Sequence, residues 1–251
     1  MTYCVGISVE SGLVFASDSR TNAGSDHVSC YGKMHTLGIA GDRQFVLLSA
    51  GNLATTQAVV AQLRHDLKDD SDCVLNKARY LDEVADYIGE VSRRRQMRHV
   101  DKDAPNAGFS PAASFILGGQ IVGEPPALHM IYPEGNHITT SAATPFLQIG
   151  EAKYGKPILD RIIQRDSTLA DAARCALVSM DSTMKSNVTV GPPVELLLYR
   201  RDALVLNLYR RLDEDDAYLK ALRSSWAENI RLAFAALPPF KLEAPAAPPD
   251  E

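Results

Sequence analysis

Residues 2–24, TYCVGISVESGLVFASDSRTNAG, predict how the fold begins. The runs at 3–8 and 13–17 are rich in β-branched and aromatic residues, and the Glu-Ser-Gly between them is typical of a hairpin turn. We therefore expect two adjacent antiparallel strands. Because the first strand starts at Tyr3, Thr2 is expected at a defined place on a sheet rather than in a loose terminus.

The rest of the chain alternates between hairpins of strands and pairs of helices. This differs from the regular strand–helix alternation of a parallel sheet, so the pattern predicts a layered α+β fold of antiparallel sheets covered by helix pairs. An Asn at position 52 precedes apolar residues at helical spacing and predicts a helix start. Further strands are expected at 45–51, 113–117, 127–132, 137–140 and 145–150, and two more within 195–211 on either side of a turn at 200–202. Helices are expected at 52–67, 80–98, 151–163 and 169–185.

Composition and charge exclude several classes of protein. The chain has 251 residues, 45% of them hydrophobic, and a net charge of −5 without a basic stretch large enough to favour a nucleic-acid partner. It shows no HExxH, GxGxxG or Walker motif, so neither a metal nor a cofactor is expected. We expect one domain at 2–236 and a disordered Pro/Ala-rich tail at 237–251.

The predicted location is the cytoplasm. The first residues lack a signal-peptide pattern, and no apolar run is long enough to span a bilayer, so no membrane association is expected. Four cysteines lie far apart without a CxxC motif, which indicates a reduced setting. Two of them, Cys4 and Cys175, lie in apolar runs and are expected in the core.

Thr2 carries the candidate chemistry. If Met1 is removed, Thr2 has a free α-amino group whose pKa is ordinarily about 7.7–8.0, so the amine can accept a proton from its own hydroxyl near neutral pH. Thr2 is small enough at the second position for ordinary methionine removal. The alternative is that Thr2 only begins a strand and has no chemical role. Other residues of the sequence are needed to distinguish these two interpretations.

Three further residues fit such a site. Asp18 ends the second strand, where the hairpin brings it near the start of the first, and Lys33 is the single charge in an almost uncharged stretch. Gly51 stands where a strand passes into a helix, and backbone N–H groups there can hold a developing oxyanion. The alternative for Asp18 and Lys33 is a structural ion pair.

A resemblance to a known family supports the catalytic interpretation. The motifs ASDSRTNAG, YGKMH, SAGNLATTQ, YPEGN and LQIGEAKYG occur in the order and spacing of the proteasome β-subunit and its bacterial relative HslV. In particular they resemble the bacterial group of this family called Anbu. The likeness extends from Thr2 to about Leu208, and the tail lies outside it.

The resemblance implies a fold and a set of roles. The fold is the four-layer αββα sandwich of N-terminal-nucleophile hydrolases, whose subunits assemble into rings or open spirals. Thr2 corresponds to the nucleophile, Asp18 to the aspartate that orients Lys33, Lys33 to the lysine that eases deprotonation of the hydroxyl, and Gly51 to an oxyanion donor. By the same correspondence Thr21, Ser49 and Leu53 would line a modest apolar substrate pocket.

Two positions depart from the family pattern. Glu151 follows Gly150 where the β-subunits have a serine, and it could accept a bond from the Thr2 amine or act as an acid in the first turn of a helix. The later support motif is replaced by MDSTMKSN, in which Asp181 is expected to point toward the site and Ser186 to support it. In HslV-like proteins, carbonyl oxygens of this turn can hold a monovalent cation. The resemblance leaves open whether this chain binds one there.

The sequence therefore predicts a threonine hydrolase that cleaves peptide or amide bonds through an acyl-enzyme on Thr2, in a self-assembled oligomer. One alternative is an amidase or amide transferase that acts on a small molecule at the same site. The other is a ring-forming scaffold that retains Met1 and has no chemistry.

Overall fold

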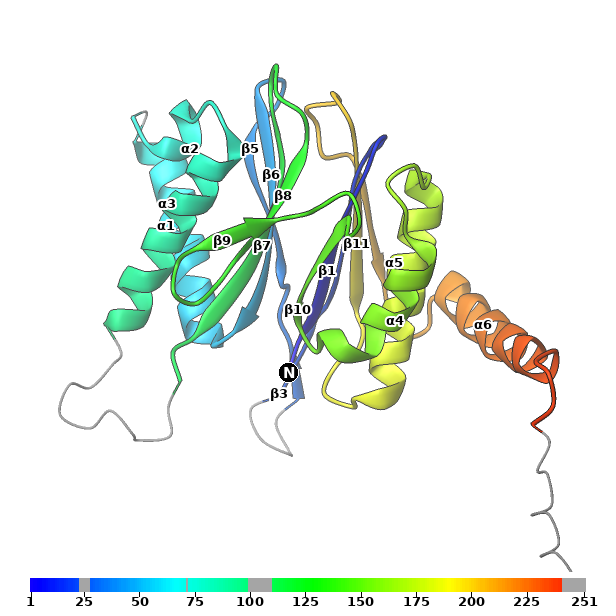
Figure 1. Cartoon of the computed structure of the whole chain (residues 1–251). Coiled ribbons are helices and arrows are strands. Elements are labelled where there is room, and N and C mark those ends of the chain that lie inside the picture. Colours follow the sequence, from blue (N-terminus) through cyan, green and yellow to red (C-terminus); the bar gives the residue numbers. More distant parts are fainter. Residues whose placement is uncertain (23–27, 71, 99–109, 241–251) are drawn as a thin grey trace, which may run out of the picture.

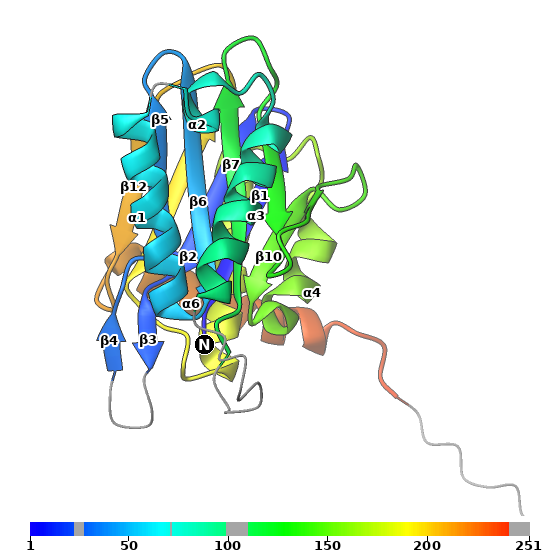
Figure 2. The same ribbon diagram turned by 90° about the vertical axis from the view of Figure 1, so that its left-hand side faces the viewer.

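The computed structural model describes residues 1–22, 28–70, 72–98 and 110–240. Within these ranges it shows two five-stranded antiparallel sheets and six helices (Figure 1). A short ribbon of β3 (Arg20–Asn22) and β4 (Val28–Cys30) extends from one end of the molecule (Figure 2). The expected α+β fold with antiparallel sheets is confirmed.

The first sheet is built around the N-terminal hairpin. Its order is β10-β1-β2-β11-β12, and β1 pairs antiparallel with both β2 and β10. Both β1 and β2 are buried along their whole length, which explains why their sequences are apolar on both faces. The strands are β1 (Tyr3–Val9), β2 (Gly12–Asp18), β10 (Phe146–Gly150), β11 (Val194–Arg200) and β12 (Leu208–Leu212).

The second sheet is a continuous antiparallel meander in the order β5-β6-β7-β8-β9. Its second strand, β6, alternates its side chains between two cores: Phe45 and Leu47 face the helices, whereas Val46 and Leu48 face the first sheet. The strands are β5 (Met34–Ile39), β6 (Arg43–Gly51), β7 (Ala113–Ile121), β8 (Ala127–Ile131) and β9 (His137–Thr139).

The helices cover the outer faces of the two sheets. Helices α1 (Leu53–Asp69), α2 (Val74–Lys77) and α3 (Leu81–Met97) share a core with the second sheet, and α4 (Ala152–Ile162) and α5 (Leu169–Ser186) share one with the first. A third core lies between the sheets. The last helix, α6 (Ala217–Ala235), projects from the body beside α5 (Figure 1).

The predicted elements are found with small shifts at their ends, and several others were not predicted. The unpredicted elements are β3, β4, β5, α2 and α6. Cys4 and Cys175 are buried, as predicted. Residues 241–251 of the predicted tail lie outside the described residues, and no described helix is long and apolar enough to cross a membrane.

Candidate active site

Thr2 lies at the beginning of β1, beside the end of β10. The backbone N–H of Glu151 donates to the Thr2 carbonyl oxygen at 2.8 Å, and Tyr3 pairs with Gly150 in the sheet. Gly150 has φ +83°, and a Cβ there would lie 1.9 Å from the Thr2 carbonyl oxygen. Glycine at this position therefore lets β10 approach the nucleophile candidate and hold its backbone.

Asp18 and Lys33 form a buried ion pair next to the N-terminus. Lys33 Nζ donates to Asp18 Oδ1 at 2.6 Å and to the Arg20 carbonyl oxygen at 2.7 Å, and the two charged side chains are 7% and 0% exposed. The pair joins the two sheets, because Asp18 ends β2 and Lys33 immediately precedes β5. The contact that the sequence analysis expected between these two residues is therefore present.

Asp18 is held by backbone groups as well. The Tyr3 N–H donates to Oδ1 at 3.0 Å, and the Gly191 N–H donates to Oδ2 at 3.3 Å. Burial raises the pKa of the Asp18 carboxyl, while the Lys33 ammonium and the two N–H donors act in the opposite direction. The carboxylate is thus fixed in place by β1, by the lysine and by the turn before β11.

Gly51 ends β6 at the wall of the same site. Its φ is +108°, and a Cβ there would lie 2.3 Å from the Ala112 carbonyl oxygen, so the position requires glycine. Helix α1 then begins at once, because the Asn52 side chain caps it by accepting from the Thr55 N–H at 3.1 Å. This capped turn brings the first residues of α1 to the cavity.

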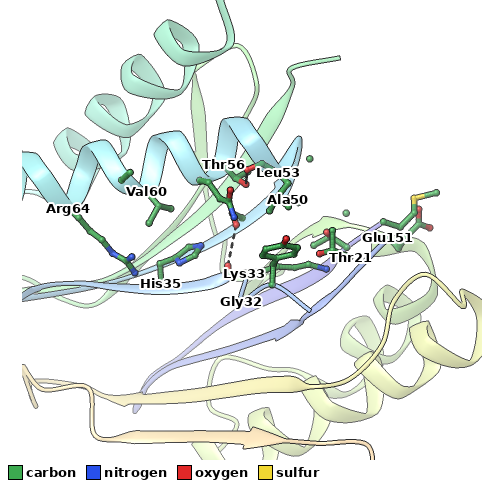
Figure 3. Close-up of a pocket in the computed structure, with 18 residues that line it drawn as sticks. Thr21, Gly32, Lys33, His35, Ala50, Leu53, Thr56, Val60, Arg64 and Glu151 are labelled. Carbon is green, nitrogen blue, oxygen red and sulfur yellow. Dashed lines mark hydrogen bonds between the residues drawn. The ribbon is translucent and has the colours of Figure 1, made fainter. Parts of the chain in front are cut away.

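A cavity of about 880 Å³ connects these residues (Figure 3). The predicted pocket residues Thr21, Ser49 and Leu53 all line it, as do Thr2, Lys33 and Gly51. Met1 lines it too and is 64% exposed. The wall formed by α1 is a helical stripe that consists of Leu53, Thr56, Gln57, Val60, Ala61 and Arg64.

Two basic residues at this cavity were not identified from the sequence. His35 lies on β5 and Arg64 on α1, and Figure 3 shows the Arg64 side chain reaching from the helix toward His35. Burial, together with the Arg64 charge, lowers the pKa of His35 to about 4. The helical spacing from Leu53 through Val60 to Arg64 was the signal that could have indicated Arg64.

Glu151 lines the cavity at the Thr2 end. It is the N-cap residue of α4, but its side chain makes no capping hydrogen bond, and its carboxylate lies 3.8 Å from Lys153 Nζ. The Glu151 side chain is 12% exposed. Glu151 was expected either to accept a hydrogen bond from the Thr2 amine or to act as an acid in the first turn of a helix. Its position beside the Thr2 backbone agrees with the first interpretation.

The structure places Asp181 and Ser186 away from the cavity of Thr2. Asp181 pairs with Arg223 of α6 at 2.7 Å, and Ser186 is the exposed last residue of α5. Both line a second cavity of about 710 Å³ between α5 and α6. The structure therefore does not bring these two predicted site residues to the cavity of Thr2.

No group of three or more His, Cys, Asp or Glu side chains in the described parts of the chain is arranged to hold a metal ion.

Comparison with solved structures finds close matches over the whole chain. "Anbu (ancestral beta-subunit) from Yersinia bercovieri" is 43% identical, with a TM-score of 0.89 over 96% of this chain and all of that one. "Helical Assembly of the Anbu Complex from Pseudomonas aeruginosa" is 46% identical, with the same TM-score over 95% and 98% of the two chains. An Anbu (Gly-1) mutant from Hyphomicrobium sp. strain MC1 is 44% identical, with a TM-score of 0.89 over 96% and 100%.

A scan against protein-family models finds no match, and neither does a comparison with curated proteins.

Proposed function

This chain belongs to the Anbu (ancestral beta-subunit) family, and from that premise we propose that it is a threonine-type hydrolase of peptide or amide bonds. One observation carries the proposal: Thr2, Lys33 and Gly51 come from three separate segments and line one cavity, and Asp18 of a fourth segment pairs with Lys33. A structural ion pair alone would not explain why the N-terminus is held against the same cavity by Gly150 and Glu151.

The first step is activation of Thr2. Once Met1 is removed, the free α-amino group takes the proton of the Thr2 hydroxyl, directly or through one water. The Lys33 ammonium has three N–H donors, and Asp18 and the Arg20 carbonyl accept two of them within the described chain. We assign the third to the Thr2 oxygen, where a fixed positive charge favours the alkoxide-like transition state.

The second step is transfer of the acyl group. Thr2 Oγ attacks the carbonyl carbon of the amide, and the oxyanion that forms accepts a hydrogen bond from the Gly51 N–H. Collapse breaks the C–N bond, and the proton held by the α-amino group passes to the departing amine. Water then attacks the ester with the α-amino group again as base, which releases the acid and restores the hydroxyl.

Glu151 is assigned to the α-amino group. An acceptor beside the protonated amine holds it in position and stabilises its charge between the two proton transfers. The placement of the Glu151 carboxylate at the Thr2 end of the cavity supports this assignment. Asp181 and Ser186 have no part in the proposed mechanism, because they line the other cavity.

We also propose how the layers of the fold are arranged, how the chain assembles and where it is located. The three cores, one between the sheets and one beneath each helical face, support a four-layer αββα arrangement. The helical assembly described for the Pseudomonas aeruginosa relative supports self-association of this chain into an open spiral or a ring. A cytoplasmic location is part of the same proposal.

The test uses the full chain produced with Met1 and examined after purification. Intact mass is expected to show that Met1 is lost, and a peptide epoxyketone, which reacts with both the hydroxyl and the amine, is expected to label Thr2 alone. Thr2→Ala should abolish labelling and amide hydrolysis while the native mass stays well above the 27.3 kDa of one chain. Thr144→Ala, in an exposed loop, is the matched control and should retain both.

Three results would contradict the proposal. Full retention of Met1 would remove the base and favour the scaffold. Undiminished turnover by Thr2→Ala would place the chemistry elsewhere. Hydrolysis of small amides alone, without any peptide in a broad panel, would favour the amidase over the peptidase.

A further inference from the structure

We propose that the cavity of Thr2 selects substrates with a glutamate side chain before the scissile bond, and that Arg64 binds its carboxylate. This inference rests on the proposed function, since it names the substrate class of the same site. It goes beyond the modest apolar pocket that the sequence predicted from Thr21, Ser49 and Leu53, all of which line this cavity. Those three residues lie on the Thr2 side of the cavity, and the positive charge of Arg64 lies beyond them.

The shape of the cavity leads from Thr2 to Arg64. One stripe of α1 forms its wall, with Leu53 near Gly51 at one end and Arg64 three turns further along the helix. A long helical side chain leans back toward the N-terminus of its own helix, so the guanidinium reaches toward the Thr2 end (Figure 3). Apolar side chains of Leu53, Val60 and Ala61 lie between, where methylene groups of a substrate side chain would pack.

Arg64 differs from the other charged residues at this cavity, because no side chain of opposite charge within the described ranges pairs with it. Lys33 is neutralised by Asp18 at 2.6 Å, and Glu151 lies near Lys153 at the Thr2 end. No carboxylate within the described ranges pairs with Arg64, and no hydrogen bond engages its guanidinium there. The far end of the cavity therefore carries an uncompensated positive charge.

The neighbouring acidic residue on α1 does not supply the missing partner. Asp66 accepts hydrogen bonds from Gln62 at 2.7 Å and from Tyr87 at 2.5 Å, on the side of α1 that faces α3. Lys68, one turn beyond Arg64, adds a second positive charge outside the cavity. An anion is thus the ligand that the local electrostatics favour.

His35 provides a second contact at the same end. It lies two residues after Lys33 on one face of β5, which places it about 7 Å further from the reacting residues. Since burial and Arg64 hold its ring neutral near pH 7, His35 has one N–H to donate to a carboxylate. Glutamate extends roughly 4–5 Å from its Cα, and the long Arg64 side chain spans the remaining gap.

The test compares three peptides that differ only in the residue before the cleaved bond: Glu, its neutral isostere Gln, and Lys. We expect the assembled protein to cleave the Glu peptide with a kcat/KM at least about tenfold above that of the Gln peptide. Arg64→Gln should bring the Glu and Gln values together, and Arg64→Glu should reverse the order of the Glu and Lys peptides. Lys68→Gln is the matched control and should leave the ratio unchanged.

A binding measurement separates this inference from the proposed function. Acetylated tripeptide acids that end in Glu or Gln correspond to cleavage products, and calorimetry measures their binding without any turnover. Tighter binding of the Glu acid by wild type, lost in Arg64→Gln, supports the inference even if no peptide is cleaved. Equal binding of the two acids, or a preference that Arg64→Gln leaves intact, overturns it.

Discussion

At the scale of single residues, the Asp18–Lys33 pair is the group whose chemistry matters most. A buried ion pair contributes little net stability, because desolvation offsets much of the attraction, whereas loss of one partner leaves an uncompensated buried charge. Besides its own contact, this pair makes three hydrogen bonds to the backbone. The Tyr3 and Gly191 N–H groups donate to the Asp18 carboxylate, and Lys33 donates to the Arg20 carbonyl oxygen. Its fixed geometry is suited to preorganised electrostatic stabilisation.

We therefore expect Lys33→Ala to reduce kcat by at least about a hundredfold, with a smaller effect on substrate binding. Asp18→Ala should have a similar effect, because it leaves the lysine unoriented. The double variant should be little worse than either single variant, as expected for residues that act as one unit. Steady-state kinetics on variants checked for native mass and thermal unfolding decide this, and a near wild-type kcat for Lys33→Ala would make the pair structural.

Gly150 is the residue through which β10 contacts Thr2, the proposed nucleophile. Gly150→Ala would bring a Cβ to 1.9 Å from the Thr2 carbonyl oxygen, so the start of β1 would have to shift. Gly41 offers a matched control, because its φ of +82° nearly equals the +83° of Gly150 but no atom lies within 4 Å of its Cβ position. Both alanines are strained by their backbone conformation, and only one displaces Thr2.

We expect Gly41→Ala to lower the melting temperature and to retain turnover. Gly150→Ala should lower both, with a kcat reduced by about a hundredfold or more, since small misplacements of reacting groups cost about that much. Thermal unfolding and kcat on the same preparations separate strain from displacement. Equal turnover in the two variants would show that β10 does not position the nucleophile.

At the scale of elements, we expect the contact between α3 and the edge of the second sheet to weaken in acid. His129 on β8 is 8% exposed, and its Nδ1 lies 3.2 Å from that of His137 on β9. His137 in turn lies 3.2 Å from Asp86 on α3. Burial, together with His137, lowers the pKa of His129 to about 4, although Asp82 and Asp86 act against this change.

The lowered pKa of His129 determines how the free energy of unfolding changes with pH. Between about pH 6.5 and 4 the unfolded chain binds a proton at His129 that the folded chain does not, so the free energy of unfolding falls as the pH is lowered through this window. The contribution is at most about 3 kcal/mol. His35, whose pKa is lowered to about 4, acts in the same direction.

His129→Gln should therefore make the free energy of unfolding less dependent on pH between 6.5 and 4. His65→Gln, on the exposed side of α1, is the control and should leave the slope as in wild type. Denaturant unfolding at fixed protein concentration measures the slope, since assembly makes stability depend on concentration. An unchanged slope in His129→Gln would mean that His129 titrates alike in both states.

At the scale of the whole molecule, the candidate active site exists only where the two sheets come together. Thr2 and Asp18 belong to the first sheet, whereas Lys33 and Gly51 flank strands of the second. The core between the sheets, with Phe15, Val46 and Ile116 among its members, fixes their separation. The proposed activity therefore requires the packed pair of sheets, and neither sheet by itself contains the candidate site.

The sequence by itself determined the elements with strong local signals and indicated four residues of the candidate site. The N-terminal hairpin, the Asn52 cap and the helix pairs have local patterns, and Thr2, Asp18, Lys33 and Gly51 lie in motifs whose spacing resembles a known family. Helix α6 was missed although Asp216 caps it by accepting from the Leu219 N–H. Its apolar spacing gives only a weak pattern, and Leu219 is its one buried residue.

Only the tertiary structure decided the positions of residues whose role depends on distant segments. Asp181 was expected to point toward the site, but the packing of α6 on α5 pairs it with Arg223 and places it at the second cavity. Arg64 became part of the cavity because α1 crosses β5 there and brings it to His35. Such contacts join residues far apart in the chain, and no local pattern of side chains specifies the packing that creates them.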